Sequence, residues 1–378
     1  MLENLDKVNW SELEHAYGSA EDVPDLIRGL LSDDEAYREQ VWGTLYGNIW
    51  HQGTVYEATA YAVPFLIELL ESPDFPDKVA MLNYLSTLAQ GNSYHDVHQH
   101  LSFFQEEDTS EMNALIAQEL QWVKDAREGV YQHYLLYAKL LHDDDRHVRL
   151  EAVSLIGVFD EHPDTLLPIL RRHLASETDI YVRTKIMIAL GRILSAHEDS
   201  SAAIVEPYLA SENPMIMRFM AAQVTVWIKG EDTPSSVIDI LKEAVTQLDV
   251  LEDAYEQMDA DRDDVLGALS ATMTFLKLED TEKIVAYLIQ SLDNLPFFRG
   301  MAVSDALLSL LFEGKKVPDG TKGSELTVFQ RELLRAISDN VLQTEIEGQV
   351  SINGNASNLL RAYGLPSRKE DIDVFLAE

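Results

Sequence analysis

Residues 145–159 read DRHVRLEAVSLIGVF, the pattern returns as DIYVRTKIMIALGRI at 179–193, and its apolar part returns again as MRFMAAQVTVWI at 217–228. The second copy follows the first by 34 residues, and the third follows the second by 35. In each copy, apolar residues recur at positions i, i+4, i+7 and i+11, a spacing that makes one stripe along a helix. The stripe residues are Val148, Ala152, Leu155 and Phe159; Val182, Ile186, Ala189 and Ile193; and Met217, Ala221, Val224 and Ile228. The pattern predicts three amphipathic helices related by repetition.

Each repeated helix carries an arginine directly after its first stripe residue, and a shorter apolar helix is expected before the second and third. The shorter helices are predicted at 165–174 and 203–209, and they contain Pro168 and Pro207, which should kink them because proline lacks an N–H. Two helices per repeat, returning every 34–35 residues, predict an array of antiparallel helix pairs.

The repeated helices resemble those of the HEAT-repeat family, an armadillo-like group of α-α superhelices. The family pattern D-x-x-V-R-x-x-A-x-x-x-L-G is matched most fully by Asp145, Val148, Arg149, Ala152, Ile156 and Gly157. The strings LYGNIWHQGTVYEAT (45–59), FRGMAVSDALLSLLF (298–312) and LLRAYGLPSRKEDIDVFL (359–376) look like stretches of uncharacterised bacterial HEAT-repeat proteins. The resemblance implies that the apolar stripes form the core and that five residues brace adjacent repeats: Asp145, Arg149, Asp179, Arg183 and Arg218. It implies no activity.

The whole chain, 1–378, is therefore predicted to be one all-α superhelix, a solenoid of stacked helix pairs. Residues 1–91 are predicted to form degenerate N-terminal repeats, with second helices at 35–49 and 77–89. Arg38 stands in the arginine position, and Lys78 replaces the arginine in the next copy. Residues 92–110 are an inserted loop, 111–230 contain the best-formed repeats, and 231–378 contain divergent repeats and a terminal cap. A single long helix is predicted over 111–142, interrupted only at Gly129.

The charge of the chain limits what it can bind. The chain has 378 residues with 29 Lys and Arg against 65 Asp and Glu, which gives 29 − 65 = −36. This charge repels nucleic-acid phosphates and anionic membranes, and it attracts basic proteins. We therefore expect a basic protein partner, no direct nucleic-acid binding and no membrane binding. The lack of cysteine excludes disulfides and thiolate chemistry, and no signal peptide or membrane-spanning run is visible, so cytoplasmic residence is expected.

A histidine-rich segment at 94–100, YHDVHQH, is the candidate metal site. His95, His98 and His100 could supply nitrogen ligands to zinc or a similar ion, with Asp96 nearby. The alternative is a polar loop whose histidines cap helix ends.

An aromatic cluster surrounds the turn at 47–59. Its members are Trp42, Tyr46, Trp50, His51 and Tyr56. Aromatic side chains at a turn suit an interface that holds a partner. The alternative is a buried, hydrogen-bonded turn that locks two degenerate repeats together.

An acidic segment at 249–264 holds eight acids and one base. It could dock a basic partner through Asp253, Glu256, Asp259, Asp261 and Asp263. The alternative is an ordinary solvated helix face. A calcium loop starting at Asp259 is disfavoured, because Asp264 and Ser270 stand where that loop needs glycine and glutamate.

The sequence contains no G-x-S-x-G, P-loop or H-E-x-x-H motif, so no catalytic residue and no cofactor is expected. The favoured function is a non-catalytic scaffold for protein–protein interaction. One alternative is an acidic inhibitor, similar in role to an immunity protein, that masks a nucleic-acid-binding toxin or enzyme. The other alternative is a metal-dependent protein centred on His95, His98 and His100.

Overall fold

The computed structural model describes residues 1–98, 110–197, 201–258, 265–346, 349–352 and 354–378. It divides the chain into two compact units, unit 1 (Met1–Thr178) and unit 2 (Asp179–Glu378). The boundary falls inside the 111–230 segment that was expected to hold the best-formed repeats. Continuation of the helix pairs into one superhelix across both units stays a prediction.

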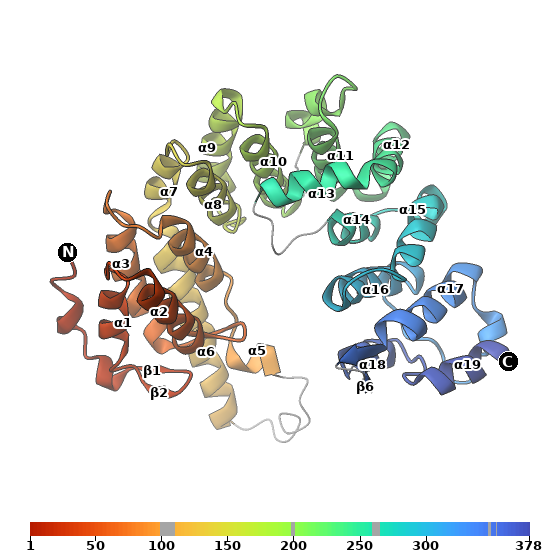
Figure 1. Cartoon of the computed structure of the whole chain (residues 1–378), viewed down its shortest axis with the longest axis horizontal. Coiled ribbons are helices and arrows are strands. Elements are labelled where there is room, and N and C mark those ends of the chain that lie inside the picture. Colours follow the sequence, from red (N-terminus) through yellow and green to blue (C-terminus); the bar gives the residue numbers. More distant parts are fainter. Residues whose placement is uncertain (99–109, 198–200, 259–264, 347–348, 353) are drawn as a thin grey trace. The chain divides into compact units, whose positions relative to one another are not determined.

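The fold is all-α, as the sequence predicted (Figure 1). In the part of the chain that the structure describes, the strands form three antiparallel two-stranded hairpins, β1–β2, β3–β4 and β5–β6. Their bounds are Glu14–His15 with Gly18–Ser19, Trp50–His51 with Thr54–Val55, and Gln343–Ile346 with Gln349–Ile352. Four of these strands have only two residues, which is too short to show the alternating pattern that reveals strands in a sequence.

Unit 1 contains nine α-helices in its described residues: α1 (Val23–Gly29), α2 (Glu35–Asn48), α3 (Glu57–Leu70), α4 (Lys78–Ala89), α5 (Tyr94–His98), α6 (Ser110–Tyr131), α7 (Tyr134–Leu140), α8 (Arg146–Ile156) and α9 (Pro163–Ser176). Helix α1 packs on α2, α3 on α4, and α7 on α8, and α4 also contacts α8. The second helices predicted at 35–49 and 77–89 are confirmed as α2 and α4.

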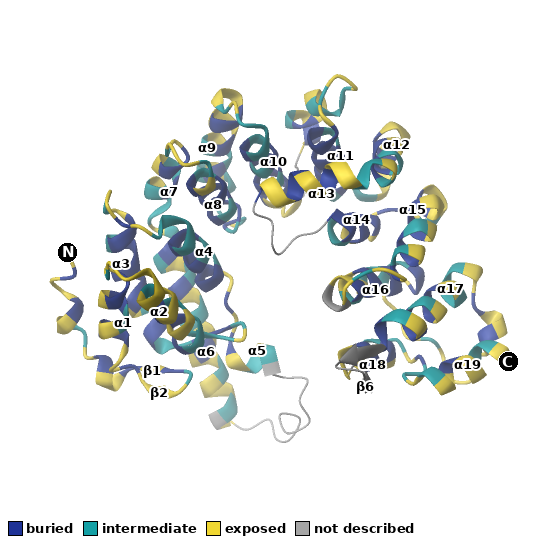
Figure 2. Cartoon of the chain, in the orientation of Figure 1, coloured by how far each residue is buried: buried dark blue, intermediate teal, exposed yellow. Residues whose placement is uncertain are grey.

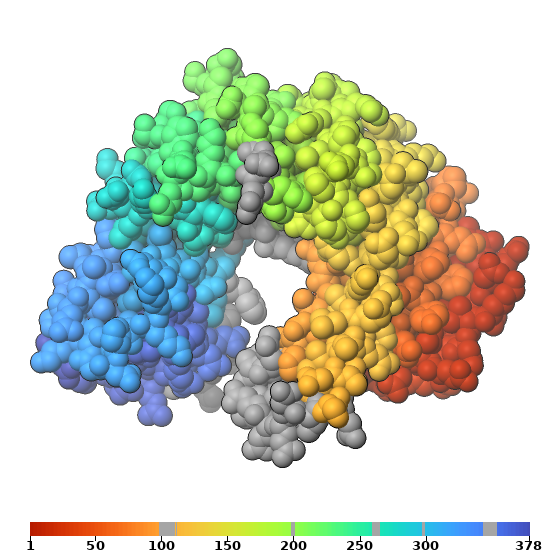
Figure 3. Space-filling model, turned by 180° about the vertical axis from the view of Figure 1, so that it is seen from behind, coloured from red at the N-terminus to blue at the C-terminus, as the bar shows by residue number. Residues whose placement is uncertain are grey.

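Unit 2 contains ten α-helices in its described residues: α10 (Ile180–Ser195), α11 (Met215–Lys229), α12 (Ser235–Ala244), α13 (Leu248–Gln257), α14 (Val265–Met273), α15 (Leu278–Ser291), α16 (Phe297–Leu311), α17 (Val328–Ala336), α18 (Gly354–Ala362) and α19 (Lys369–Ala377). Helix α11 contacts α10, α12, α13 and α14, so it lies at the centre of the first half of this unit. In a space-filling view the colours within each unit follow sequence order, so successive parts of the chain lie beside one another (Figure 3).

The predicted apolar stripes lie on α8, α10 and α11, except for Phe159, which follows the end of α8 at Ile156. Eleven of the twelve stripe residues are at most 3% exposed, and the twelfth, Ile228, is half-buried. Buried residues follow the inner faces of these helices (Figure 2). Each fully buried aliphatic side chain contributes roughly 1.5–3 kcal/mol through removal of its surface from water. The spacing read from the sequence therefore identifies the faces that hold these helices in place.

Aspartates begin three of the repeated helices as N-caps, where a side-chain oxygen accepts hydrogen bonds from amides of the first turn. Asp145 accepts from the N–H of His147, and Asp179 accepts from the N–H groups of Tyr181 and Val182. Asp34 does the same for α2. The hydrogen bond from the His147 amide lowers the pKa of Asp145. Asp145 thus caps its own helix, and the contact between repeats comes from the basic residues.

In unit 1, a basic residue on each second helix pairs with a carboxylate in the connection that leads to the next one. Arg38 of α2 binds both carboxylate oxygens of Asp77, at 2.8 and 3.2 Å, just before α4. Lys78 of α4 lies 3.4 Å from Asp143, just before α8. Arg149 of α8 lies 3.1 Å from Glu177, at the end of α9. These pairs, called the cation relay below, link α2, α4, α8 and α9 in order.

Unit 2 repeats this arrangement with different partners. Arg218 of α11 donates two hydrogen bonds to Glu243 of α12, at 2.9 and 2.7 Å. The guanidinium carbon of Arg183 lies 5.4 Å from the centre of the Tyr208 ring, in the connection before α11. In unit 2, Arg183 therefore contacts the connection that follows its helix, and Arg218 contacts the following helix.

The long helix predicted over 111–142 is broken, but not at Gly129. Gly129 lies inside α6 and faces Val63 of α3, and a β-carbon there would make only ordinary van der Waals contact with that side chain. The break comes at Gln132 and His133, between α6 and α7. Helix α6 packs on α3 and α4, while the cation relay runs from α4 directly to α8. Helix α6 is therefore an addition to the pattern of helix pairs.

The helix predicted at 203–209 consists of two 3-10 turns, Ala202–Ile204 and Glu206–Leu209. Pro207 stands at the start of the second turn, where its missing N–H leaves no bond unmade. The expectation of a kinked α-helix here was wrong, because Pro207 lies in the first turn of a separate 3-10 helix and not in the middle of an α-helix. Pro168, in contrast, lies inside the continuous helix α9.

Gly191 lets α10 and α11 approach closely. A β-carbon at this position would lie 2.5 Å from Cγ2 of Val224 and 3.0 Å from Cε3 of Trp227, which is closer than such atoms can pack. The glycine shared by the first two repeats is therefore required here by packing between helices.

We expect Gly191→Ala to lower the free energy of unfolding by roughly 1–3 kcal/mol, because the added methyl overpacks the contact between α10 and α11. Gly43→Ala is the matched control, since Gly43 is exposed on α2 with nothing within 4 Å of the added carbon. The control should raise stability by about 0.5–1 kcal/mol through higher helix propensity. Urea denaturation measures both, and equal effects of the two substitutions would contradict the assigned contact.

Arg149→Gln should lower the free energy of unfolding by roughly 3 kcal/mol, because it removes the cation beside a buried carboxylate. The side chains of Arg149 and Glu177 are 16% and 7% exposed. Arg28→Gln is the control, because Arg28 pairs with the exposed Asp6 and Asp25, and it should leave the denaturation midpoint unchanged. A midpoint for Arg149→Gln equal to that of the wild type would rule out a stabilising relay at this pair.

Candidate functional site

The histidine segment is only partly described. Helix α5 covers Tyr94–His98, so part of the loop predicted at 92–110 is helical. The backbone N–H of His95 donates to Glu119 of α6 at 2.9 Å, and Asp96 accepts a hydrogen bond from Ser93 at 2.8 Å. His98 ends α5, and His100 lies outside the described residues. Within the described ranges, no three His, Asp or Glu side chains gather as metal ligands, and the metal site stays a prediction.

The aromatic cluster lies where α2 meets α4. Nε1 of Trp42 donates to Asp77 at 3.1 Å, and the Tyr46 hydroxyl donates to Asn83 at 3.2 Å. The rings of Trp42 and Tyr46 have their centres 5.6 and 4.6 Å from that of Tyr84, which is fully buried. The side chains of Trp42 and Tyr46 therefore join the two helices to each other.

The remaining members of the cluster belong to the connection between α2 and α3. Trp50 and His51 form β3, and Tyr56 is the residue before α3. The ring of Trp50 lies against Tyr46, with their centres 5.9 Å apart. Burial is the main cause that raises the pKa of Tyr56 to about 12. All five aromatic residues are half-buried, and these contacts favour the structural alternative, a turn that locks two helix pairs together.

The acidic segment supplies an ordered stripe on α13. Asp249, Glu252, Asp253 and Glu256 are all exposed, and their spacing of i, i+3, i+4 and i+7 places them on one face. They are called the α13 acidic stripe below. The sequence singled out Asp253 and Glu256 but not Asp249 and Glu252, although helical spacing would have found them. Asp259, Asp261 and Asp263 lie outside the described residues.

The opposite face of α13 is anchored. Leu251, Ala254 and Tyr255 are at most 6% exposed, so exposed and buried residues alternate along this helix (Figure 2). Burial, with the nearby charges of Glu252 and Asp249, raises the pKa of Tyr287 on α15. The acidic stripe therefore projects from a helix whose opposite face is buried.

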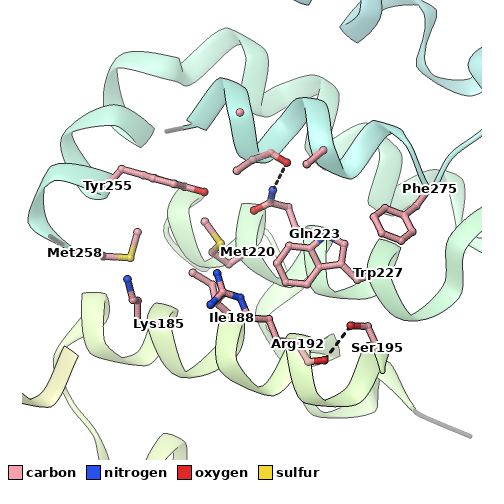
Figure 4. Close-up of a pocket in the computed structure, with 13 residues that line it drawn as sticks. Lys185, Ile188, Arg192, Ser195, Met220, Gln223, Trp227, Tyr255, Met258 and Phe275 are labelled. Carbon is pink, nitrogen blue, oxygen red and sulfur yellow. Dashed lines mark hydrogen bonds between the residues drawn. The ribbon is translucent and has the colours of Figure 1, made fainter. Parts of the chain in front are cut away.

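A pocket of about 310 Å³ lies between α10, α11, α13 and α14, and it is called the unit 2 pocket below (Figure 4). Its apolar lining includes Ile188, Met220, Trp227, Met258 and Phe275. One wall belongs to α14 and presents only small residues, Gly267, Ala268 and Ala271. Sequence reasoning missed this pocket, because its residues come from four helices spread over 185–275 and share no motif.

Three polar side chains lead into the unit 2 pocket. Lys185 and Arg192 both extend from α10 toward it (Figure 4). Gln223 is 1% exposed, and its Nε2 donates to the Ala268 carbonyl at 3.0 Å and to the Thr272 hydroxyl at 2.9 Å. Because both donor bonds point to α14, the amide orientation is fixed and its oxygen faces the pocket (Figure 4).

Helices α10 and α11 differ from the rest of the chain in their charge composition. Helices α10 and α11 contain five Lys and Arg and no Asp or Glu, in a chain with 65 acids. The sequence marked two of these five residues, Arg183 and Arg218, as parts of a repeat and gave no signal for the others. The structure shows that Lys185 and Arg192 line a pocket.

Comparison with known proteins adds little to this geometry. No protein-family model matches the chain, and no curated protein matches it. A crystal structure of an engineered protein aligns over 93% of this chain and 99% of that chain, at 13% identity and a TM-score of 0.31. A likeness at that TM-score carries no argument. Among the residues that the structure describes, no helix combines the length and apolar character that a bilayer crossing requires.

The aromatic cluster gives a direct test of its structural role. Trp42→Phe should lower the free energy of unfolding by about 1.5 kcal/mol, because it removes the donor to the Asp77 carboxylate while keeping an aromatic ring. Trp50→Phe is the comparison. It should lower the free energy of unfolding by less, because a phenylalanine ring still contacts Tyr46. Thermal or urea denaturation checks both. A larger loss of unfolding free energy for Trp50→Phe than for Trp42→Phe would contradict the assigned role of Trp42 in joining α2 to α4.

Proposed function

We propose that this chain is a non-catalytic, HEAT-like binding protein that holds a basic protein partner on its acidic surface. The observation that carries the proposal is the charge imbalance. With 65 acids and 29 Lys and Arg, at least 65 − 29 = 36 carboxylates have no Lys or Arg to pair with one-to-one. Several of those cations are already used in the interior contacts of the helix pairs.

The cation relay uses the scarce cations for structure. Arg38, Lys78 and Arg149 each pair with a carboxylate that borders the following helix, and outside the relay Arg218 pairs with Glu243 inside α12. The four basic side chains are at most 22% exposed. Cations held in this way contribute little to the field outside the protein. The surface that a partner meets is therefore more negative than a uniform spread of charge would make it, and it would speed encounter with a basic protein.

The α13 acidic stripe is where the proposal can be tested. Its four carboxylates project from one face of a helix whose other face is buried, so a partner would meet a fixed row of charges. Preorganised charges lose less entropy on binding than charges on a mobile segment. The sharper alternative, an acidic inhibitor of a nucleic-acid-binding protein, requires the same surface.

The test captures partners from the source cell on immobilised protein and elutes them with a salt gradient. The compared variants are wild type, a stripe variant (Asp249→Asn, Glu252→Gln, Asp253→Asn, Glu256→Gln) and a control variant with four exposed acids of unit 1 neutralised. The control changes are Glu12→Gln, Glu14→Gln, Glu21→Gln and Glu39→Gln. We expect a basic partner whose retention falls with salt and whose affinity, measured on the purified pair, drops at least about tenfold for the stripe variant only.

Capture of only acidic or neutral partners, with no dependence on salt, would contradict the proposed function. Equal losses for the stripe and control variants would leave net charge, and not the α13 acidic stripe, as the cause of binding. If the captured protein is a nuclease, its inhibition by the wild-type chain would select the inhibitor alternative. A nuclease that stays active in the complex would exclude it.

A further inference from the structure

We propose that a groove between α14 and α16 binds a linear aliphatic polyamine, a molecule whose ammonium groups are separated by short methylene chains. The groove has a volume of about 510 Å³, and it is called the α14–α16 groove below. Both helices belong to unit 2, where they lie in contact (Figure 1). The inference does not depend on the protein partner proposed above. It rests on the lining of the groove, its oxygen atoms and its charge.

Small residues line both helical walls of the α14–α16 groove. The lining residues are Gly267, Ala268, Ser270, Ala271 and Thr274 on one side and Ala302, Asp305, Ala306 and Ser309 on the other, together with Tyr363 after α18. Each helical wall spans seven residues, which is roughly 10 Å along the axis. The methyl groups along this length can contact an extended chain of methylene groups. The volume also lies within the range of small-molecule sites, roughly 300–1,000 Å³.

Asp305 is the anchor for an ammonium group. Its side chain is exposed on α16 and lines the groove between Ala302 and Ser309. Among the residues that the structure describes, no basic side chain pairs with Asp305 and no group donates a hydrogen bond to its carboxylate. A carboxylate in this state can accept charge-assisted hydrogen bonds from an ammonium group, and such bonds are roughly twice as strong as those between neutral groups.

Hydroxyl oxygens supply further acceptors along the α14 side of the groove. Ser270 is 1% exposed, and its hydroxyl donates to the Gly267 carbonyl at 2.9 Å. The Thr274 hydroxyl donates to the Ala271 carbonyl at 2.7 Å. Because each hydroxyl proton is already used within the chain, the oxygen can act toward a ligand only as an acceptor. Ammonium groups have N–H donors and no acceptor, so they match these oxygens.

Tyr363 adds an aromatic ring that is held in place. Its carbonyl accepts from the Val317 N–H at 2.8 Å, and its N–H donates to the Leu360 carbonyl at 3.1 Å. Its ring centre lies 6.1 Å from that of Phe312, which is 7% exposed. A tyrosine ring attracts a cation over its face. Tyr363 therefore offers a polyamine a contact in addition to Asp305.

The charge of the groove favours a cation. None of the ten described lining residues is basic. Lys315 and Lys316 follow the end of α16, but neither lines the groove, and Lys315 lies 2.6 Å from Glu313. The net charge of −36 also attracts polycations at long range. That field does not distinguish one cation from another, so the choice of a linear polyamine depends on the groove and on Asp305.

The test compares three probes of equal charge, 3+: spermidine, the compact hexaamminecobalt(III) ion and the blocked peptide N-acetyl-trilysine amide. Calorimetry on the full chain at about 0.15 M salt, where the screening length is about 8 Å, measures their affinities. We expect spermidine to bind at least about tenfold more tightly than either of the others. Equal charge removes general attraction as the cause of a difference. The peptide distinguishes a free polyamine from lysine side chains of a protein partner.

Matched variants locate the site. Asp305→Asn should weaken spermidine binding at least about tenfold, whereas Asp280→Asn, at an exposed acid of α15 outside the groove, should change it less than about twofold. Ala302→Leu should also weaken spermidine about tenfold, because it fills the groove, and it should leave hexaamminecobalt(III) binding unchanged. Ala286→Leu on α15 is its control, since both alanines are exposed and only Ala302 lines the groove. Circular dichroism confirms that each variant is folded.

Equal or tighter binding of hexaamminecobalt(III) than of spermidine would overturn the proposal and leave net charge as the cause of binding. Tighter binding of the trilysine peptide would overturn it in favour of lysine side chains. Equal losses for Asp305→Asn and Asp280→Asn would contradict the assigned anchor, and spermidine binding that Ala302→Leu leaves unchanged would contradict the assigned groove. Absence of any spermidine binding at about 1 mM would overturn the proposal as well.

Discussion

Burial of one narrow apolar stripe on each repeated helix is the constraint on which this structure depends. Each stripe contains only four residues, of which Phe159 alone lies just beyond its helix, and eleven of the twelve are almost completely buried. Because the rest of each helix can be polar, an extremely acidic chain still forms a core. The stripe also fixes the rotation of each helix about its axis. That rotation directs the arginine after the first stripe residue toward the following helix or connection, where its partner lies.

The few basic residues and the many carboxylates are distributed differently. Several basic residues lie in partly buried ion pairs, and the excess carboxylates lie on the surface. The cation relay places Arg38, Lys78 and Arg149 in partly buried pairs inside unit 1, and Arg218 takes the same position in unit 2. Excess carboxylates stay on the surface, as the α13 acidic stripe shows. Helices α10 and α11 are the exception, because they carry cations without acids and border the unit 2 pocket. The described residues thus include both an exposed acidic stripe on α13 and a pocket with two basic lining residues.

Features that depend on periodicity along one helix can be predicted from the sequence. Contacts between residues that are far apart in the sequence cannot. The helical class, α2, α4 and the three stripes follow from spacing along one helix. The partners of Arg149 and Arg218 lie 28 and 25 residues away, and no spacing rule identifies them. For Trp42 and Tyr46 the sequence left open a binding cluster or a buried turn, and their contacts with Asp77, Asn83 and Tyr84 of the next helix pair favour the second. The unit 2 pocket is the extreme case, since four helices supply its walls.

Hydrogen exchange of the intact protein, followed by mass spectrometry, tests the central claim most directly. Amides covered by a buried stripe should exchange only when the whole unit unfolds, whereas weakly anchored segments exchange through local opening. We predict that α8, α10 and α11 are the slowest-exchanging helices, and that the 3-10 turns at Ala202–Ile204 and Glu206–Leu209 exchange much faster. Exchange of α8, α10 and α11 as fast as that of those turns would contradict a structure held together by the apolar stripes.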